Sequence, residues 1–334
     1  MHRVPRPVPI LTTLPHLRNR TLTTGCQPAS VRRSAILATA AIFVLPSSGA
    51  LGRAGANCNG TSVSMTPLTD LGTKRYHGYT GGLYGNGRNA PSARYLEIGL
   101  AAANRVHPID GHVVLLSIGM SNTTQEFSAF KRLADADRRK STQLTIVDGA
   151  QGGQDAETIK DPSARFWSVV DTRISAAGAT AAQVQAVWLK EAIAREANPF
   201  PQDALRLETD LRQIVGILHA RFPNLQLIYL SSRTYAGYAT TALNPEPQAY
   251  DSGFAARWLV NERLKGKLKG PWIAWGPYLW TNGTRGRKDG LVWTCTDTRP
   301  SDGTHPSPSG QAKIASLLWT FFATSSTAKS WFLR

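Results

Sequence analysis

Runs of consecutive apolar residues alternate with amphipathic stretches along most of this chain. A strand covered on both faces of a sheet needs such a continuous run rather than an alternating pattern. Helices are indicated where apolar residues recur every three to four positions. We expect them over about 207–222, from Asp251 to Leu264, and from near Pro308 onward. The runs that fit buried strands are 112–118, 144–147, 184–189, 225–230 and 272–275.

Strands that alternate with helices in this way predict βαβ units and a parallel sheet. We therefore expect an α/β fold, a three-layer αβα sandwich with a central parallel sheet of about five strands. No linker or repeat divides the chain, so one domain is predicted over 57–334, with its core at 111–323. Residues 57–110 are rich in Gly, Tyr and Asn and predict an irregular lead-in that packs on the domain and borders the substrate cleft.

Residues 1–56 have the order of a secretory leader. Several arginines without any acid come first, then the apolar run Ala35–Leu45, then the small residues of Ala54-Gly55-Ala56. The run is shorter than the roughly 20 residues that cross a bilayer, so no stable membrane span is expected after cleavage. The alternative is an uncleaved membrane anchor. We expect a secreted or periplasmic protein.

Removal of this leader changes both the charge and the cysteine count. The leader holds seven arginines, so the formal net charge falls from +16 to +9. The remaining basic residues are scattered in short runs, and we expect no nucleic-acid partner. Cys58 and Cys295 remain, and an even pair in an exported protein predicts a disulfide, the alternative being two free thiols. The histidines lack metal-binding spacing, so neither a metal nor a cofactor is expected.

The chemically informative residues follow the apolar runs. In open parallel sheets, ligands bind beyond the carboxyl ends of the strands. Ser121 follows the first run, Gly152 and Gly153 the second, and Lys190-Glu191 the third. The segment Asp302-Gly-Thr-His305 comes just before the last helix. These residues are therefore expected at one edge of the sheet.

A serine hydroxyl needs a base within hydrogen-bonding reach to act as a nucleophile. His305 can accept the proton of Ser121, and Asp302 can orient the imidazole. The backbone N–H groups of Ser121 and Gly152 are candidate donors to the oxyanion, with Gly153 as the alternative to Gly152. Taken alone, Ser121 has a plainer interpretation as a helix N-cap.

The order and positions of these residues resemble the SGNH (GDSL-like) hydrolase superfamily over roughly 112–323. Its members carry a nucleophilic Ser after the first strand, a Gly after the second, usually an Asn after the third, and Asp-x-x-His near the C-terminus. The resemblance implies a flavodoxin-like fold and a serine esterase that needs no cofactor. Two departures are the Gly-Met-Ser around Ser121, in place of Gly-Asp-Ser, and Lys190. In the sialate and xylan O-acetylesterase branch, which this chain resembles most, a Gln of Trp-x-Gln-Gly-Glu stands near the position of Lys190.

Lys190 could donate to the oxyanion as a cation, or it could pair with Glu191 or Asp155 in a structural role. Further candidates for substrate binding are Gly153, Glu191, Arg233 and Tyr235. Arg233 could meet a carboxylate or sugar hydroxyls, or could brace the catalytic aspartate. The aromatic residues of 272–280 could stack on sugar rings or belong to the core.

The function expected from these residues is the removal of an O-acyl group, such as acetyl, from a carbohydrate or another small ester. The acyl group would pass through Ser121. One alternative is an acyltransferase, which uses the same intermediate. Another is a non-catalytic envelope or polysaccharide-binding protein in which the site has decayed.

Overall fold

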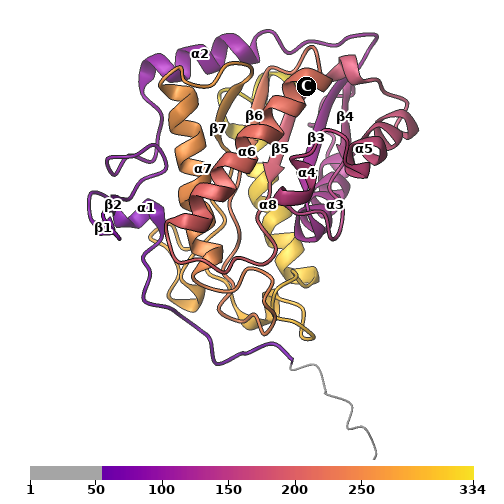
Figure 1. Ribbon diagram of the computed structural model, residues 1–334. Helices are drawn as coiled ribbons and strands as arrows, with labels where there is room; N and C mark the ends of the chain where they lie inside the picture. Colours follow the sequence, from indigo (N-terminus) through magenta and orange to yellow (C-terminus); the bar gives the residue numbers. More distant parts are fainter. Residues whose placement is uncertain (1–54) are drawn as a thin grey trace, which may run out of the picture. The chain divides into compact units, whose positions relative to one another are not determined.

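The structure is a computed structural model that describes residues 55–334. Its central element is a five-stranded sheet (Figure 1). Its strands are β3 (Val113–Gly119), β4 (Leu144–Asp148), β5 (Val184–Lys190), β6 (Leu227–Leu230) and β7 (Trp272–Trp275). All neighbours pair in parallel, in the order β4-β3-β5-β6-β7. Counted along the chain this is the order 2-1-3-4-5 of flavodoxin-like sheets. The predicted fold class is confirmed.

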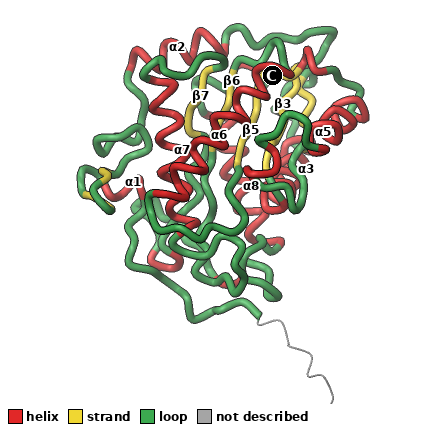
Figure 2. Tube along the Cα trace, in the orientation of Figure 1, coloured by secondary structure: helices red, strands yellow, loops and turns green. Residues whose placement is uncertain are grey.

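The continuous apolar runs are explained by burial on both faces, because every residue of β3, β5, β6 and β7 is buried. Helices α6 and α7 pack together over one face, and α3 and α8 pack together on the other (Figure 1). Long loops gather at one end of the domain (Figure 2). The helices that flank the sheet are α3 (Ser121–Ala136), α4 (Ala156–Ile159), α5 (Arg165–Ala176), α6 (Gln202–Arg221), α7 (Gln248–Leu264) and α8 (Pro308–Thr324).

The lead-in is more regular than the sequence indicated. It contains α1 (Leu68–Leu71), the paired strands β1 (Arg75–Tyr76) and β2 (Tyr79–Thr80), and α2 (Ala93–Ala103). Helix α2 begins after Ser92, whose side chain accepts from the Tyr95 N–H at 3.3 Å. The Tyr95 hydroxyl then donates to the Ile273 carbonyl at 2.7 Å, which ties α2 to β7. The prediction of an irregular lead-in is therefore wrong for residues 93–103, which form a helix.

Aromatic residues on both sides of the sheet belong to the core. Trp272, Trp275, Tyr278 and Trp280 are each 5% exposed or less, so the alternative of core packing is correct for them and stacking on sugars is not. The Trp275 indole donates to the Leu83 carbonyl at 2.7 Å, which holds the lead-in against β7. In the β1–β2 hairpin, the ring of Tyr76 stacks on Phe254 of α7 and that of Tyr79 contacts Trp258 of the same helix. The hairpin therefore covers α7.

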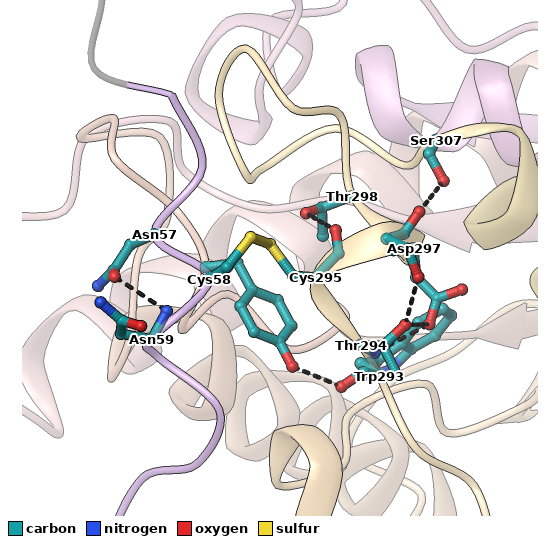
Figure 3. The surroundings of a disulfide bond; sticks show 11 residues. Asn57, Cys58, Asn59, Trp293, Thr294, Cys295, Asp297, Thr298 and Ser307 are labelled. Atoms are coloured by element: carbon teal, nitrogen blue, oxygen red, sulfur yellow. Dashed lines mark hydrogen bonds between the residues drawn. A yellow bond between two sulfur atoms is a disulfide. The ribbon is translucent and has the colours of Figure 1, made fainter.

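The predicted disulfide is present between Cys58 and Cys295, which are 237 residues apart (Figure 3). Cys295 begins a short 3₁₀ helix, Cys295–Asp297, and Thr298 next to it pairs with Pro306 in an isolated β-bridge. The segment between Thr298 and Pro306 carries Asp302 and His305. The disulfide therefore holds the start of the described chain against the base of this loop.

The remaining elements are the 3₁₀ turns Ala181–Gln183 and Gly283–Arg285 and the C-terminal helix α9 (Lys329–Phe332). Residues 55–334 belong to one compact unit. Within this range, no helix is long and apolar enough to cross a membrane. Residues 1–54 of the expected leader, which was predicted over 1–56, lie outside the described residues.

Candidate active site

The turn between β3 and α3 presents Ser121. Gly119 is required here, because a Cβ at this position would lie 2.2 Å from the Lys190 carbonyl oxygen. Met120 is the N-cap of α3 and Ser121 is the first helical residue, so the plainer interpretation of Ser121 as an N-cap is wrong. As the first residue of the helix, Ser121 has a backbone N–H with no intrahelical acceptor.

Ser121, His305 and Asp302 form a chain of hydrogen bonds. The Ser121 Oγ lies 2.9 Å from the His305 Nε2, and the His305 Nδ1 lies 3.0 Å from Asp302 Oδ2. When Nδ1 donates its proton to the carboxylate, Nε2 is left as the acceptor for the serine proton. The structure thus brings the Asp302–His305 pair to Ser121, although Ser121 and His305 are 184 positions apart in the sequence.

Asp302 is held as a carboxylate by the loop that carries it. Its Oδ1 accepts from the backbone N–H groups of Thr304, at 2.8 Å, and His305, at 2.9 Å. Partial burial acts to raise the pKa of Asp302, but these N–H groups and the His305 ring outweigh it, so the pKa lies below its ordinary value. An ionised Asp302 can orient the imidazole and stabilise its protonated form.

Two contacts fix this loop against the rest of the site. Gly303 has φ 61°, and a Cβ there would lie 1.8 Å from the Tyr238 carbonyl oxygen, so only glycine fits. The fully buried side chain of Asn122 donates from Nδ2 to the Thr304 carbonyl at 3.0 Å. Asn122 follows Ser121 directly, so one helix start positions both the nucleophile and the loop that bears His305.

The loop after β4 lies beside the nucleophile. The Gln151 N–H donates to the Gly119 carbonyl at 2.9 Å, which fixes the two turns to each other. A Cβ on Gly152 would lie 3.8 Å from the Ser121 Cβ, so Gly152 lies beside the serine. Gly153, with φ 73°, lies one residue farther along, beside a neighbouring hollow. That the backbone N–H groups of Ser121 and Gly152 donate to the oxyanion stays a prediction.

The residues of the site follow one another along a 2-1-3-4-5 parallel sheet. The chain resembles the SGNH hydrolases. No protein-family model and no curated protein matches it. Solved structures of similar fold include a GDSL-like lipase from Bacteroides thetaiotaomicron, at 10% identity and a TM-score of 0.36, which covers 68% of this chain and 96% of the lipase.

Two further solved structures are similar to a comparable degree. The periplasmic domain of a lipopolysaccharide acetyltransferase from Salmonella Paratyphi A has 13% identity and a TM-score of 0.38, with 68% of this chain and 94% of that chain covered. A carbohydrate acetylesterase from Sinorhizobium meliloti has 13% identity and a TM-score of 0.33, with 61% and 94% covered. These likenesses are too distant to assign residue roles, which rest on the geometry of this chain.

Lys190, where SGNH hydrolases usually have an amide, is part of a buried ion pair. Its Nζ lies 2.7 Å from both carboxylate oxygens of Glu126, and the two side chains are 1% and 0% exposed. Neither partner considered from the sequence is used, because Asp155 caps α4 and the Oε1 of Glu191 accepts from the Ala192 N–H. The ammonium therefore lies in a structural pair with Glu126, which speaks against its proposed role as an oxyanion donor.

Three of the four expected substrate-binding residues are buried in the structure. Glu191, Arg233 and Tyr235 are only 2–3% exposed, which makes them poor candidates for contact with a substrate. The Tyr235 hydroxyl donates to the Gly60 carbonyl at 2.5 Å. Burial lowers the pKa of Arg233, against the attraction of nearby carboxylates that include Glu126 and Glu191. Arg233 thus belongs to a buried charge cluster rather than to the cleft.

The open space beside His305 is formed by residues that carry no motif. A hollow of about 370 Å³ adjoins His305 and Asp302, and a second of about 610 Å³ adjoins Gly153. Both hollows are lined in part by the loop 240–243 after β6. The only sequence signal for this loop was its position beyond the carboxyl end of a strand. The remaining lining residues of the first hollow are Thr240, Thr241, Leu243, Arg299 and Ser301.

Proposed function

We propose that this protein is a serine ester hydrolase that removes an acyl group, such as acetyl, from a carbohydrate or another small ester. The observation that carries the proposal is the hydrogen-bonded chain from Ser121 through His305 to Asp302. A helix N-cap or a packing histidine would not require this sequence of three partners. The adjoining hollow of about 370 Å³ lies in the range of small-molecule sites.

The proposed reaction has two halves. The His305 Nε2 takes the proton of Ser121 as Oγ attacks the ester carbonyl carbon, and the backbone N–H groups of Ser121 and Gly152 stabilise the oxyanion. When the tetrahedral intermediate collapses, His305 returns the proton to the departing alcohol and the acyl group stays on Oγ. A water molecule, deprotonated by His305, then attacks the acyl carbon and releases the acid.

Acyl transfer is the second candidate, since the same acyl-enzyme reacts with an alcohol as with water. The hollow beside His305 supports acyl transfer, because it offers room for an acceptor sugar. A product analysis separates the two reactions. Incubation with an acylated donor and an excess of sugar should release free acid from a hydrolase and form a new sugar ester with a transferase.

We further propose that the protein works outside the cytoplasm. The leader-like composition of the first 56 residues supports this, as does the disulfide between Cys58 and Cys295, since disulfides persist in oxidising compartments. N-terminal mapping of the exported protein should find a chain that begins near Asn57. Recovery of the intact N-terminus from the cytoplasmic fraction would contradict the proposal.

A fluorophosphonate probe tests the proposed nucleophile directly. Wild-type protein should be labelled at Ser121 and should hydrolyse 4-nitrophenyl acetate, whereas Ser121→Ala should lose both properties and keep its circular dichroism spectrum. Ser168→Ala is the matched control, because Ser168 is an exposed serine on α5. Labelling at another serine, or unchanged turnover by Ser121→Ala, would refute the assignment.

A further inference from the structure

A side chain from helix α5, which lies beside β4, holds the loop that follows this strand (Figure 1). Arg173, in the last turn of α5, donates from Nη1 to the backbone carbonyls of Asp148 at 3.0 Å and Ala150 at 2.7 Å. Within residues 55–334, its guanidinium takes part in no ion pair. The hydrogen bonds of this arginine therefore go to the backbone of one short loop.

Arg173 supplies one of the two hydrogen bonds that fix the first peptide of the loop. That peptide joins Asp148 to Gly149. Its C=O accepts from Arg173, and its N–H donates to the Ser117 hydroxyl at 3.2 Å. A peptide that is bound at both ends cannot rotate without losing two hydrogen bonds. The loop therefore leaves the sheet in a fixed direction.

The peptide that joins Ala150 to Gln151 is fixed in the same way. Its C=O accepts from Arg173, and its N–H donates to the Gly119 carbonyl at 2.9 Å. Gly119 belongs to the turn that presents Ser121. Because the C=O and N–H of a trans peptide point in opposite directions, Arg173 holds the side of this peptide that is opposite to the turn.

The next peptide, between Gln151 and Gly152, carries the expected second donor to the oxyanion. Within residues 55–334, the Gly152 N–H has no hydrogen-bond acceptor, whereas the N–H groups of the three residues before it all have one. Gly152 is exposed and lies beside Ser121. An oxyanion needs donors of this kind, which are free and already aimed before the reaction. The direction of this N–H depends on the peptide that precedes it, which Arg173 holds.

We propose that Arg173 is a positioning residue for ester hydrolysis. By holding two carbonyls of the loop, it keeps the Gly152 N–H directed at the oxyanion that forms when Ser121 attacks the ester. The inference rests on the proposed function. If Arg173 served only the stability of the fold, its loss would lower the unfolding midpoint and leave turnover per folded molecule unchanged.

The first test replaces Arg173 by Met, which has no donor, and by Lys. A single nitrogen, Nη1, makes both hydrogen bonds, so a lysine ammonium can replace it. Arg173→Met should lower kcat/KM for 4-nitrophenyl acetate by about 10- to 100-fold per folded molecule, the effect of a misplaced catalytic group. Arg173→Lys should restore most of the loss. Arg165→Met is the matched control, since Arg165 is an exposed residue at the start of the same helix.

A second measurement reports on the oxyanion itself. A trifluoromethyl ketone adds to a serine nucleophile as a tetrahedral oxyanion, so its inhibition constant should rise in Arg173→Met by the factor that kcat/KM loses. The dependence of kcat/KM on pH, which reports the protonation of the base, should keep its shape, because Arg173 takes no part in the contacts of Ser121, His305 and Asp302. A changed pH dependence would show that the substitution disturbs the whole site, and would overturn the inference.

The outcomes separate this inference from the proposed function. If wild-type protein cleaves 4-nitrophenyl acetate through Ser121 and Arg173→Met keeps full turnover per folded molecule, the proposed function stands and the inference is wrong. If Arg173→Met does not fold, the same measurements on Arg173→Gln decide. If Ser121→Ala retains turnover, the proposed nucleophile is wrong. Hydrogen exchange of the amides of 149–151, which should be faster in Arg173→Met, then still decides whether Arg173 holds the loop.

Discussion

Replacing Lys190 by Met should make this protein much easier to unfold, because the substitution leaves the Glu126 carboxylate buried without its partner. In the native structure the Lys190 Nζ contacts both oxygens of Glu126 at 2.7 Å, and Glu126 is fully buried. Burial raises the pKa of Glu126 and lowers that of Lys190, and the attraction within the pair opposes both shifts. Without the ammonium, the attraction that stabilises the ionised carboxylate is lost, and only the cost of burying its charge remains.

The size of the effect can be worked out from the protonation of Glu126. In the variant the folded protein must bind a proton at Glu126, which the unfolded chain releases above its ordinary pKa of 4.5. Each pH unit above that value costs about 1.4 kcal/mol, so the unfolding free energy at pH 7 should fall by about 3 kcal/mol. This agrees with the 3–5 kcal/mol expected for removal of one partner of a buried pair. At pH 5 the loss should shrink to about 1 kcal/mol.

Urea unfolding followed by tryptophan fluorescence, at pH 5 and pH 7, measures these free energies by linear extrapolation. The double variant Lys190→Met/Glu126→Leu removes both charges and should recover most of the loss, since an apolar replacement of a buried pair is often nearly neutral. Turnover per folded molecule should change little in either variant. The Thr123 hydroxyl bonds the Lys190 backbone carbonyl, which the substitution keeps.

Two results would refute this reasoning. A loss of less than about 1 kcal/mol that is the same at pH 5 and pH 7 would show that the pair does not hold a buried charge in place. A stable Lys190→Met protein with a 100-fold lower turnover would instead restore Lys190 as an oxyanion donor.

Three further predictions address the site, the disulfide and a buried acid. Asp302→Asn should lower turnover in ester assays by about 10³- to 10⁴-fold, because His305 loses the carboxylate that sets its tautomer. The circular dichroism spectrum should not change. Near-normal turnover would show that Asp302 has no part in the mechanism. Replacing Cys58 and Cys295 together by Ser should cost about 4 kcal/mol in urea unfolding, since the disulfide closes a very long loop, and an unchanged midpoint would contradict it. Burial raises the pKa of Asp251 to about 7, so the folded protein keeps a proton that the unfolded chain releases above pH 4. The unfolding free energy of wild type relative to Asp251→Asn should therefore fall by up to about 3 kcal/mol as the pH rises from 4 to 7, and a constant difference would show that Asp251 titrates normally.

The layers of the fold and the main candidates for chemistry could be predicted from the sequence alone. A strand covered on both faces must be apolar throughout, so the runs at 112–118 and 184–189 could be recognised without any knowledge of their neighbours. Parallel strands end at a common edge, which is why Ser121 and Asp302-x-x-His305 could be expected together. The pairing of Cys58 with Cys295 followed from there being only two cysteines after the leader.

Which of the other polar residues face the cleft depends on contacts between segments that are far apart in the chain. Lys190 does not pair with the neighbouring Glu191. Its partner Glu126 lies on α3, 64 residues away in the sequence. Arg233 and Tyr235 follow a strand, as cleft residues do, yet the segments that cover them leave them buried. The direction of a side chain beyond a strand end depends on how the loops pack over it, and that packing joins residues far apart in the chain. For this reason the hollow beside His305 could not be predicted from any local pattern.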